Sequence, residues 1–358
     1  MNTTMMTGRF APTPSGRMHI GNVYALFAAW LSVNSRHADT GSDGDAGDAG
    51  VGADAGNGRM LLRIEDVDVS RAVPDADRWI MDDLNWLGLR WQGEPVYQSQ
   101  RLDIYRQAVD SLRAMMLVYP CFCSRSDLRA ISAPQQDDGF VIYPGTCRRL
   151  ALRRRSNGDA SNLAGKRHSL RIAVPDGHSP HAEVGFVDRV FGERRFNLAR
   201  EVGDAGPYTH LRAHETVLAS VVDDVLMGVD DVVRGRDLLR STALHIWLRE
   251  QLAASGFWND APPVRYAHLP LIDTASGIRL AKRKHSLDMG VIRASHIAPE
   301  QVIGYCAWLL GIRPGSDGGP VAMSAQEALP LFSWRCLRGD TADRTVDGRL
   351  LDVLRAIR

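Results

Sequence analysis

The chain has 358 residues, and its 43 Lys and Arg against 42 Asp and Glu give a formal charge of +1, which excludes a histone-like polycation. Hydrophobic residues make up 44% and charged residues 24%, the composition of a globular protein and not of a disordered chain. No segment approaches ~20 consecutive apolar residues and no signal-peptide pattern opens the chain, so we expect a cytosolic protein without a membrane partner.

The first unit is a strand, a turn and a helix. Gly8–Phe10 predicts a short strand, residues 12–16 (PTPSG) must turn, and His19–Leu31 predicts a largely buried helix. Free N–H groups and the positive dipole end at such a helix start attract phosphate, and His19 in the first turn can stabilise charge on a phosphoryl group. An ordinary helix start after a proline-rich turn explains these residues equally well.

The second unit is a strand that ends in acidic residues. Residues 39–58, rich in Gly, Asp and Ala, predict a flexible insertion. Met60–Ile64 then predicts a buried strand that runs into Glu65, at the carboxyl end where open α/β sheets bind their ligands. The spacing of apolar residues predicts a helix over Pro74–Leu89.

The composition changes over residues 116–188, where Arg, Pro, Gly and Cys without a long helical pattern predict an inserted subdomain. Beyond it, Leu218–Asp224 predicts a buried strand, and Val232–Leu239 predicts a strand that opens a helix, so the sheet resumes. A basic loop at Gly277–His285 carries Lys282, a mobile point charge suited to polyphosphate, although a solvated charged surface is the plainer explanation. Past residue 298 the pattern is helical and short.

Three cysteines of the inserted region lie close together in the sequence. Cys121, Cys123 and Cys147 supply three potential thiolates, and Tyr143 stands four residues before the last of them. Soft ligands in this number, with a fourth position filled nearby, predict a structural Zn²⁺ site, and three free thiols are the alternative. The isolated Cys306 and Cys336 are expected to pack in the core. An arginine cluster contacts nucleic-acid phosphates or forms a solvated loop, and it comprises Arg148, Arg149, Arg153, Arg154 and Arg155.

Taken in order, these motifs resemble the class I aminoacyl-tRNA synthetases in their glutamyl form. Residues 8–31 are similar to the HIGH-type signature, Leu62–Asp68 to the second strand of the family, residues 221–235 to its later strands and Arg279–Arg283 to its KMSKS-type loop. The resemblance covers about residues 8–290. It implies a Rossmann-like α/β core that binds ATP and L-glutamate, forms glutamyl-adenylate and passes glutamate to a nucleic-acid hydroxyl.

The resemblance also implies four parts. The first half of the catalytic core is expected at residues 8–115 and a zinc-binding, acceptor-type subdomain at 116–190. The second half of the core, with the KMSKS-type loop, is expected at 191–297. A short helical C-terminal region at 298–358 takes the place of an anticodon-binding domain.

Site residues carry over from the family by position. His19 and Lys282 are expected to be catalytic, through ATP phosphates and the transition state. The residues expected to bind glutamate, by guanidinium–carboxylate pairs and a carboxylate for the ammonium group, are Arg9, Phe10, Ala11, Pro12, Thr13, Glu65, Thr216 and Arg234. Those expected at ATP, which brings Mg²⁺, are Pro12, Ser15, Gly16, His19, Gly21, Asn22 and Lys282. The implied ligands of one structural Zn²⁺ per chain are Cys121, Cys123, Tyr143 and Cys147.

The length after the KMSKS-type loop distinguishes members of the family. Only Lys284–Arg358 follows it, whereas full glutamyl-tRNA synthetases continue for well over a hundred residues. The chain therefore resembles the truncated paralogue, a monomer in our expectation, which activates glutamate without tRNA and attaches it to the queuosine base of tRNA(Asp). A shortened synthetase that charges tRNA(Glu), and an inactive regulatory protein that binds amino acid or RNA but no DNA, are the alternatives.

Two residues depart from the family pattern. Thr216 stands where the family has a tyrosine that helps to bind glutamate, and Tyr208 replaces that tyrosine only after a local rearrangement, because its spacing does not match. Asn22 stands where the HIGH-type signature ends in histidine. Both departures bear on glutamate selectivity and on activity.

Overall fold

The computed structural model describes residues 5–35, 58–124, 126–127, 142–143, 145–156, 168–209, 216–259, 261–274, 288–313, 318–346 and 350–358. The backbone alone is described for residues 153–156, 205–209, 216 and 274. The expected insertion at 39–58 lies outside the described residues apart from Gly58, and the basic loop with Lys282 lies outside them as well. No helix in the described part of the chain is long and apolar enough to cross a membrane.

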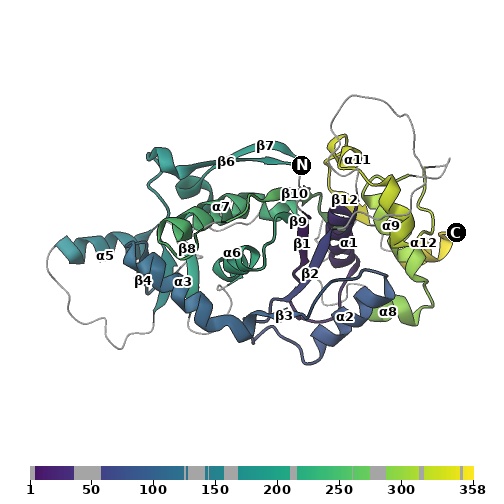
Figure 1. Ribbon diagram of the computed structural model, residues 1–358, viewed down its shortest axis with the longest axis horizontal. Helices are drawn as coiled ribbons and strands as arrows, with labels where there is room; N and C mark the ends of the chain where they lie inside the picture. The colour runs from purple at the N-terminus through teal and green to yellow at the C-terminus, as the bar shows by residue number, and fades with distance from the viewer. Residues whose placement is uncertain are drawn as a thin grey trace.

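A seven-stranded sheet forms the centre of the molecule, in the order β3-β2-β1-β9-β10-β6-β7 (Figure 1). Its strands are β1 (Thr7–Phe10), β2 (Arg59–Ile64), β3 (Val96–Tyr97), β6 (Glu183–Asp188), β7 (Gly192–Asn197), β9 (Asp231–Gly235) and β10 (Arg265–Leu269). Every neighbouring pair is parallel except the β6–β7 hairpin. Strands β2 and β9 flank β1 on opposite sides, so the strand order reverses at β1, and open α/β sheets bind ligands at such a reversal.

Helices cover both faces of the sheet. Helix α1 (Ile20–Asn34) packs on β1 and β9, as its buried apolar residues predict. On the other side α3 (Leu102–Ala114), α6 (Thr216–Leu226) and α7 (Leu239–Ala254) pack on one another around a core of their own. Helix α2 (Ala76–Trp86) follows β2, within the range where the sequence predicts a helix.

The segment predicted as a strand at 218–224 is helix α6, and the prediction is wrong. A short, mostly apolar run fits a buried helix as well as a buried strand, and here the sign of the helix is the spacing of its few polar residues. In the helix, Asp223 and Asp224 both turn inward, where their carboxylates meet arginines. Helix α6 supplies Val217 and Ser220 to the wall of the candidate site described below.

A small antiparallel sheet stands apart from the large one, and its strands are β4 (Val118–Cys121), β5 (Ser169–Ile172) and β8 (Ala205–Thr209). Beside it α5 (Thr146–Ser156) forms an 11-residue helix, so the expectation of no long helix in this region is wrong. Its many arginines leave little apolar periodicity to reveal it. Both strands of the β6–β7 hairpin, on either side of the expected boundary at 190, belong to the large sheet.

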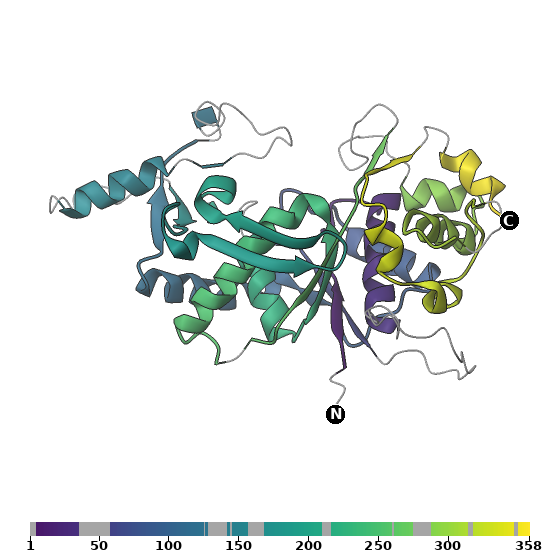
Figure 2. The same ribbon diagram turned by 90° about the horizontal axis from the view of Figure 1, so that it is seen from above.

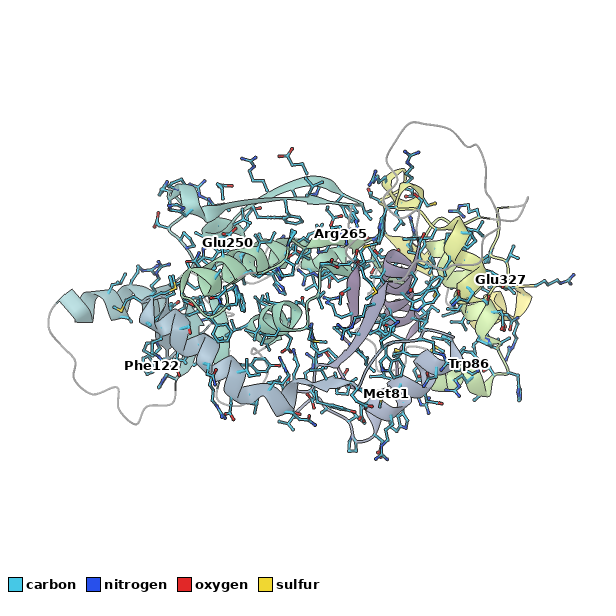
Figure 3. All side chains as sticks on the ribbon, viewed as in Figure 1. Met81, Trp86, Phe122, Glu250, Arg265 and Glu327 are labelled. Carbon is cyan, nitrogen blue, oxygen red and sulfur yellow. The ribbon has the colours of Figure 1, made fainter. Side chains whose placement is uncertain are left out.

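The C-terminal region packs on α1 at the other end of the molecule from α5 (Figure 2). It contains α8 (Met289–Ala294), α9 (Pro299–Leu309), α10 (Ala325–Ala328), α11 (Arg335–Arg338) and α12 (Leu350–Ala356). It also sends a strand back to the core, since β12 (Arg344–Val346) pairs in parallel with β11 (Ile272–Thr274). The labelled Phe122 and Glu327 mark the two ends in Figure 3.

Candidate active site

A cavity of about 360 Å³ opens at the carboxyl ends of β1 and β9, where the strand order reverses. Its size is that of a site for a small organic molecule. The residues predicted for the site that line it are Arg9, Ala11, Pro12, Thr13, Gly21, Asn22, Glu65 and Arg234. Strand β1, the turn after β2, the start of α1 and strand β9 thus bring residues from distant parts of the sequence to one place.

Arg9 is a fixed cation in the wall of this cavity. Its side chain is buried on β1, and its Nε donates to Asp224 Oδ1 at 3.2 Å. Burial alone raises the pKa of Asp224, but Arg63 and Arg9 outweigh it and hold that pKa below its usual range. Asp224 is therefore an ionised anchor for both arginines.

Glu65 is held by two donors at the rim of the cavity. Arg63 Nη2 donates to Glu65 Oε1 at 3.0 Å, and Ser220 Oγ donates to the same oxygen at 3.0 Å. Arg63 also bonds Asp224 through Nη1 at 2.5 Å, so one fully buried guanidinium orients both carboxylates. Among the described residues no hydrogen bond to the second oxygen of Glu65 is found, and Glu65 lines the cavity.

Arg234 reaches the cavity from β9 with neutral partners. Its Nη2 donates to Thr242 Oγ1 at 2.6 Å and its Nε to His268 Nε2 at 3.3 Å. His268 is itself fixed through Nδ1 by Asp188 Oδ2 at 2.6 Å. Burial and the nearby Arg9 lower the pKa of Arg234 to about 10, so it still carries its charge at neutral pH. Within the described part of the chain, no carboxylate forms an ion pair with Arg234.

His245 of α7 is a buried member of the cavity wall. Burial first, and then Arg234, keep its pKa well below 6.5, while Asp224 acts in the opposite direction and Arg9 adds to the lowering. The imidazole is therefore neutral at physiological pH. A neutral imidazole can donate one hydrogen bond and accept another without adding charge to the pocket.

The start of α1 is built around His19. His19 Nδ1 accepts from the Gly21 amide at 3.1 Å, and the His19 amide donates to Asn22 Oδ1 at 3.1 Å, so the side chains cap the helix. A Cβ on Gly21 would lie 3.1 Å from the His19 ring, tighter than most real contacts, which is a reason for glycine there. Burial lowers the pKa of His19. An isolated antiparallel β-bridge joins the backbone of His19 to that of Asp288, which lies six residues after Lys282 in the sequence.

Other predicted residues do not line the cavity or are not described. The Phe10 side chain is fully buried in the main core, and Ser15, Gly16 and His19 lie outside the cavity wall. For Thr216 the structure describes the backbone of α6 and no side chain, and for Tyr208 the backbone of β8 alone. Lys282 lies outside the described residues.

Several wall residues escape the sequence prediction, among them Val217, Ser220, Val233, Ser241 and His245. Val217 and Ser220 belong to α6, and a helical reading places 216, 217, 220 and 224 on one face. The signal was therefore the helical spacing itself. His245 had no such signal, because a lone histidine in an apolar helix is not distinctive.

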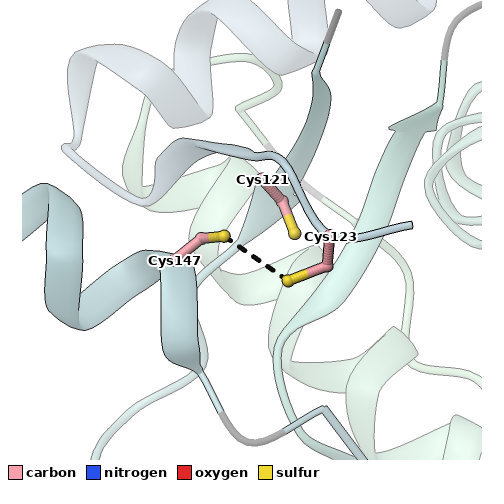
Figure 4. Close-up of side chains that lie close together, drawn as sticks. All are labelled: Cys121, Cys123 and Cys147. Atoms are coloured by element: carbon pink, nitrogen blue, oxygen red, sulfur yellow. Dashed lines mark hydrogen bonds between the residues drawn. The ribbon is translucent and has the colours of Figure 1, made fainter. Parts of the chain in front are cut away.

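The three cysteines of the inserted region come together (Figure 4). Their sulfurs lie within 4.8 Å of one another, with 3.6 Å between Cys123 Sγ and Cys147 Sγ. The Tyr143 hydroxyl lies 3.5 Å from Cys121 Sγ and 3.6 Å from Cys123 Sγ. These residues form a small buried core with Tyr119 and Ala173, separate from the main cores. The cluster is a candidate metal centre, and Cys306 is buried in the main core as expected.

Comparison with known proteins identifies the family of the chain. Residues 51–329 match the family described as tRNA synthetases class I (E and Q), catalytic domain. A Glutamyl-Q tRNA(Asp) synthetase of Symbiobacterium thermophilum is 39% identical over 342 residues, covering 92% of this chain and 92% of that protein. One from Nitratidesulfovibrio vulgaris is 36% identical, covering 87% and 88%.

A solved structure has a similar fold. The crystal structure of a glutamate tRNA ligase from Elizabethkingia meningosepticum, in complex with its amino acid, superposes with a TM-score of 0.66 at 21% identity. The match covers 98% of this chain and 69% of that one. The family model and the curated relatives confirm the resemblance seen in the motifs: the chain belongs to the class I tRNA synthetases of the glutamate and glutamine (E and Q) group.

Proposed function

We propose that the protein activates L-glutamate with ATP as glutamyl-adenylate, without tRNA, and transfers it to the queuosine base at the wobble position of tRNA(Asp). The observation that carries the proposal is Arg234, a cation in the cavity wall whose described partners, Thr242 and His268, are neutral. A partly buried cation with no ion-pair partner among the described residues calls for an anionic ligand. Two relatives whose matches cover 92% and 87% of this chain are Glutamyl-Q tRNA(Asp) synthetases.

The charges of the cavity suit glutamate. Arg9 and Arg234 offer guanidinium groups to its two carboxylates, and the free oxygen of Glu65 accepts from its ammonium group. Asp224 neutralises part of the charge of Arg9. The two guanidinium groups of the empty pocket therefore repel each other less than two unpaired cations would. Glutamine lacks one of the two carboxylates and leaves a guanidinium unpaired, which favours glutamate over its amide.

ATP, which brings Mg²⁺, fits at the start of α1 in this proposal. The cavity wall includes Gly21 and Asn22 from the first turn, where backbone N–H groups favour phosphate. His19 and Lys282 hold the phosphates and the charge that develops in the transition state. Pro12, Ser15 and Gly16 form the preceding turn.

We assign the cysteine cluster to one structural Zn²⁺, with Tyr143 as the fourth ligand. Sulfurs bound at about 2.3 Å to a tetrahedral zinc ion lie about 3.8 Å apart. The 3.6 Å between Cys123 Sγ and Cys147 Sγ, and the 3.5 and 3.6 Å from Tyr143 to Cys121 and Cys123, are close to such a geometry. The residues therefore fit the ion, which would tie β4 to the start of α5.

The test is transfer of radiolabelled glutamate to tRNA(Asp) with queuosine, to tRNA(Asp) without it and to tRNA(Glu). Label on the queuosine-bearing tRNA(Asp) alone, mapped to the anticodon by nuclease digestion, is the expected result. Label on tRNA(Glu) contradicts the proposal and identifies a shortened synthetase. Absence of both label and glutamate-dependent pyrophosphate exchange would identify an inactive, regulatory protein.

A further inference from the structure

The pairing of β4 with β5 places Arg171 beside the cysteine cluster. In the small antiparallel sheet, Arg171 of β5 stands opposite Tyr119 of β4. Cys121 is two residues further along β4, so its side chain emerges on the same face of the sheet as that of Tyr119. Directly opposed and diagonal side chains on one face are within reach of each other, which brings the guanidinium to the cluster.

The guanidinium touches two of the four proposed ligands. Arg171 Nε donates to Cys121 Sγ at 3.3 Å, and its central carbon lies 3.9 Å from the centroid of the Tyr143 ring, over its face. Arg171 Nη1 donates to the Asp204 carbonyl oxygen at 2.9 Å, which fixes the plane of the group. One rigid, planar side chain therefore orients a sulfur and a phenol ring at the same time.

The charge of Arg171 is directed at the cluster. In the described residues, Arg171 forms no ion pair with a carboxylate. The carboxylate of Asp204, whose backbone carbonyl Arg171 bonds, instead accepts from Tyr119, Arg148 and the Val174 amide. Three thiolates around one Zn²⁺ carry a net charge of −1 before the tyrosine is counted, in a partly buried place where such charge needs an offset.

We propose that Arg171 is a positioning residue of the metal centre, which aligns Cys121 and Tyr143 and offsets the negative charge of the zinc–thiolate group. The inference rests on the zinc assignment proposed above. Groups in this outer position commonly change metal affinity 10- to 100-fold when they are replaced. Arg171 does not belong to the described lining of the cavity.

The test compares zinc affinity of the full-length chain and its variants by competition with a chromophoric chelator. Arg171→Gln is expected to raise the zinc Kd about 10- to 100-fold. Arg171→Lys keeps the charge without the planar fork, and an intermediate Kd is expected. The matched control is Arg148→Gln, which removes an arginine of the same module that bonds the Val174 carbonyl and Asp204, and its zinc Kd is expected to stay within about 3-fold of wild type.

Cobalt substitution supplies a second readout. The thiolate-to-cobalt charge-transfer and tetrahedral d–d bands of the loaded protein should change in Arg171→Gln and not in Arg148→Gln. Wild-type affinity and cobalt bands in Arg171→Gln, or equal weakening in Arg148→Gln, overturn the inference. If Arg171→Gln does not fold by circular dichroism, wild-type affinity in Arg171→Lys overturns it instead. A wild-type chain that binds no zinc overturns the metal assignment as well, whereas zinc binding without glutamyl transfer overturns only the proposed function.

Discussion

Two arginines in the cavity have different surroundings. Arg9 shares Asp224 with Arg63, whereas Arg234 depends on Thr242 and a histidine for its orientation. In the proposed glutamate complex, Arg9 would therefore meet the ligand with part of its charge already neutralised, and Arg234 would meet it with its full charge. The loss of Arg234 should therefore affect glutamate more than any other single change in the wall.

Arg234→Gln is expected to lower kcat/KM for glutamate about 10- to 100-fold, because hydrogen bonds to charged groups contribute about 1.5–3 kcal/mol. The KM for ATP should change much less. Glutamate-dependent pyrophosphate exchange measures both values. Arg249→Gln, which removes a half-buried arginine of α7 that bonds the Pro262 carbonyl, is the matched control. Equal losses in the two variants would contradict the role of Arg234.

Buried histidines should make the protein less stable in acid. The pKa of His245 is lowered in the folded chain, so below about pH 6.5 the unfolded chain binds a proton that the folded chain does not. Stability is lost as the pH falls through this range, by up to about 1.4 kcal/mol per pH unit for one such group. His245→Gln should reduce the drop in Tm between pH 7.5 and 5.5.

The control for this measurement is His178→Gln, which replaces an exposed histidine. Its Tm should fall between pH 7.5 and 5.5 as much as that of the wild type. A drop in His245→Gln as large as in the wild type would show that His245 does not titrate differently on unfolding.

At the scale of elements, α6 shows what the sequence hides. The strand–turn–helix around residues 8–34, strand β2 and the opening of α7 follow from hydrophobic runs, glycine and proline, and they were predicted. Helix α6 was not, because residues 218–225 are all buried, and such a short, mostly apolar run is as typical of a buried strand as of a buried helix. The partnership of Asp224 with Arg9 and Arg63 depends on tertiary structure, which no local pattern records.

The pairing of β11 with β12 gives a test at this scale. Asp343, just before β12, accepts from Arg236 after β9 and from the Leu271 amide at 2.8 Å before β11. Asp343→Ala should destabilise the fold by about 1–2 kcal/mol, since it leaves these donors unpaired. Because β11 leads to Lys282, the KM for ATP should rise as well.

Thermal unfolding and pyrophosphate exchange at varied ATP check this result. Asp340→Ala is the control, since Asp340 pairs with Arg344 of the same segment and reaches neither β9 nor β11. If both variants behave alike, the contact of Asp343 with the core has no special role.

For the whole molecule, the cysteine cluster and the cavity lie on separate cores. The cysteines pack with Tyr119 and Ala173, while the cavity is built on the large sheet. Removal of zinc by a chelator should therefore leave glutamate-dependent pyrophosphate exchange largely intact and reduce transfer to tRNA(Asp). Both activities can be followed in one preparation, with zinc added back as the control. Parallel loss of the two would contradict this separation.

The family and its order of motifs could be recognised from the sequence, since Arg9, Glu65 and Arg234 stand at the ends of readable strands. Phe10 shows where the assignment of binding residues by their position in a family motif fails. It adjoins Arg9, but alternate residues of a strand face opposite sides, and its ring is in the core. The cysteine cluster follows from residue types, whereas its neighbour Arg171 depends on the register of two strands.

During synthesis, the central strand β1 is made long before its second neighbour, β9. It pairs with β2 about 50 residues later, but Gly8 meets Asp231 of β9 only after about 220 further residues have been made. At roughly 5–20 residues per second, that edge stays unpaired on the ribosome for about 10–45 s. An unpaired strand edge that is exposed for so long can pair with other nascent chains and aggregate. The yield of active protein should therefore depend on chaperones that shield the N-terminal third while the rest is translated.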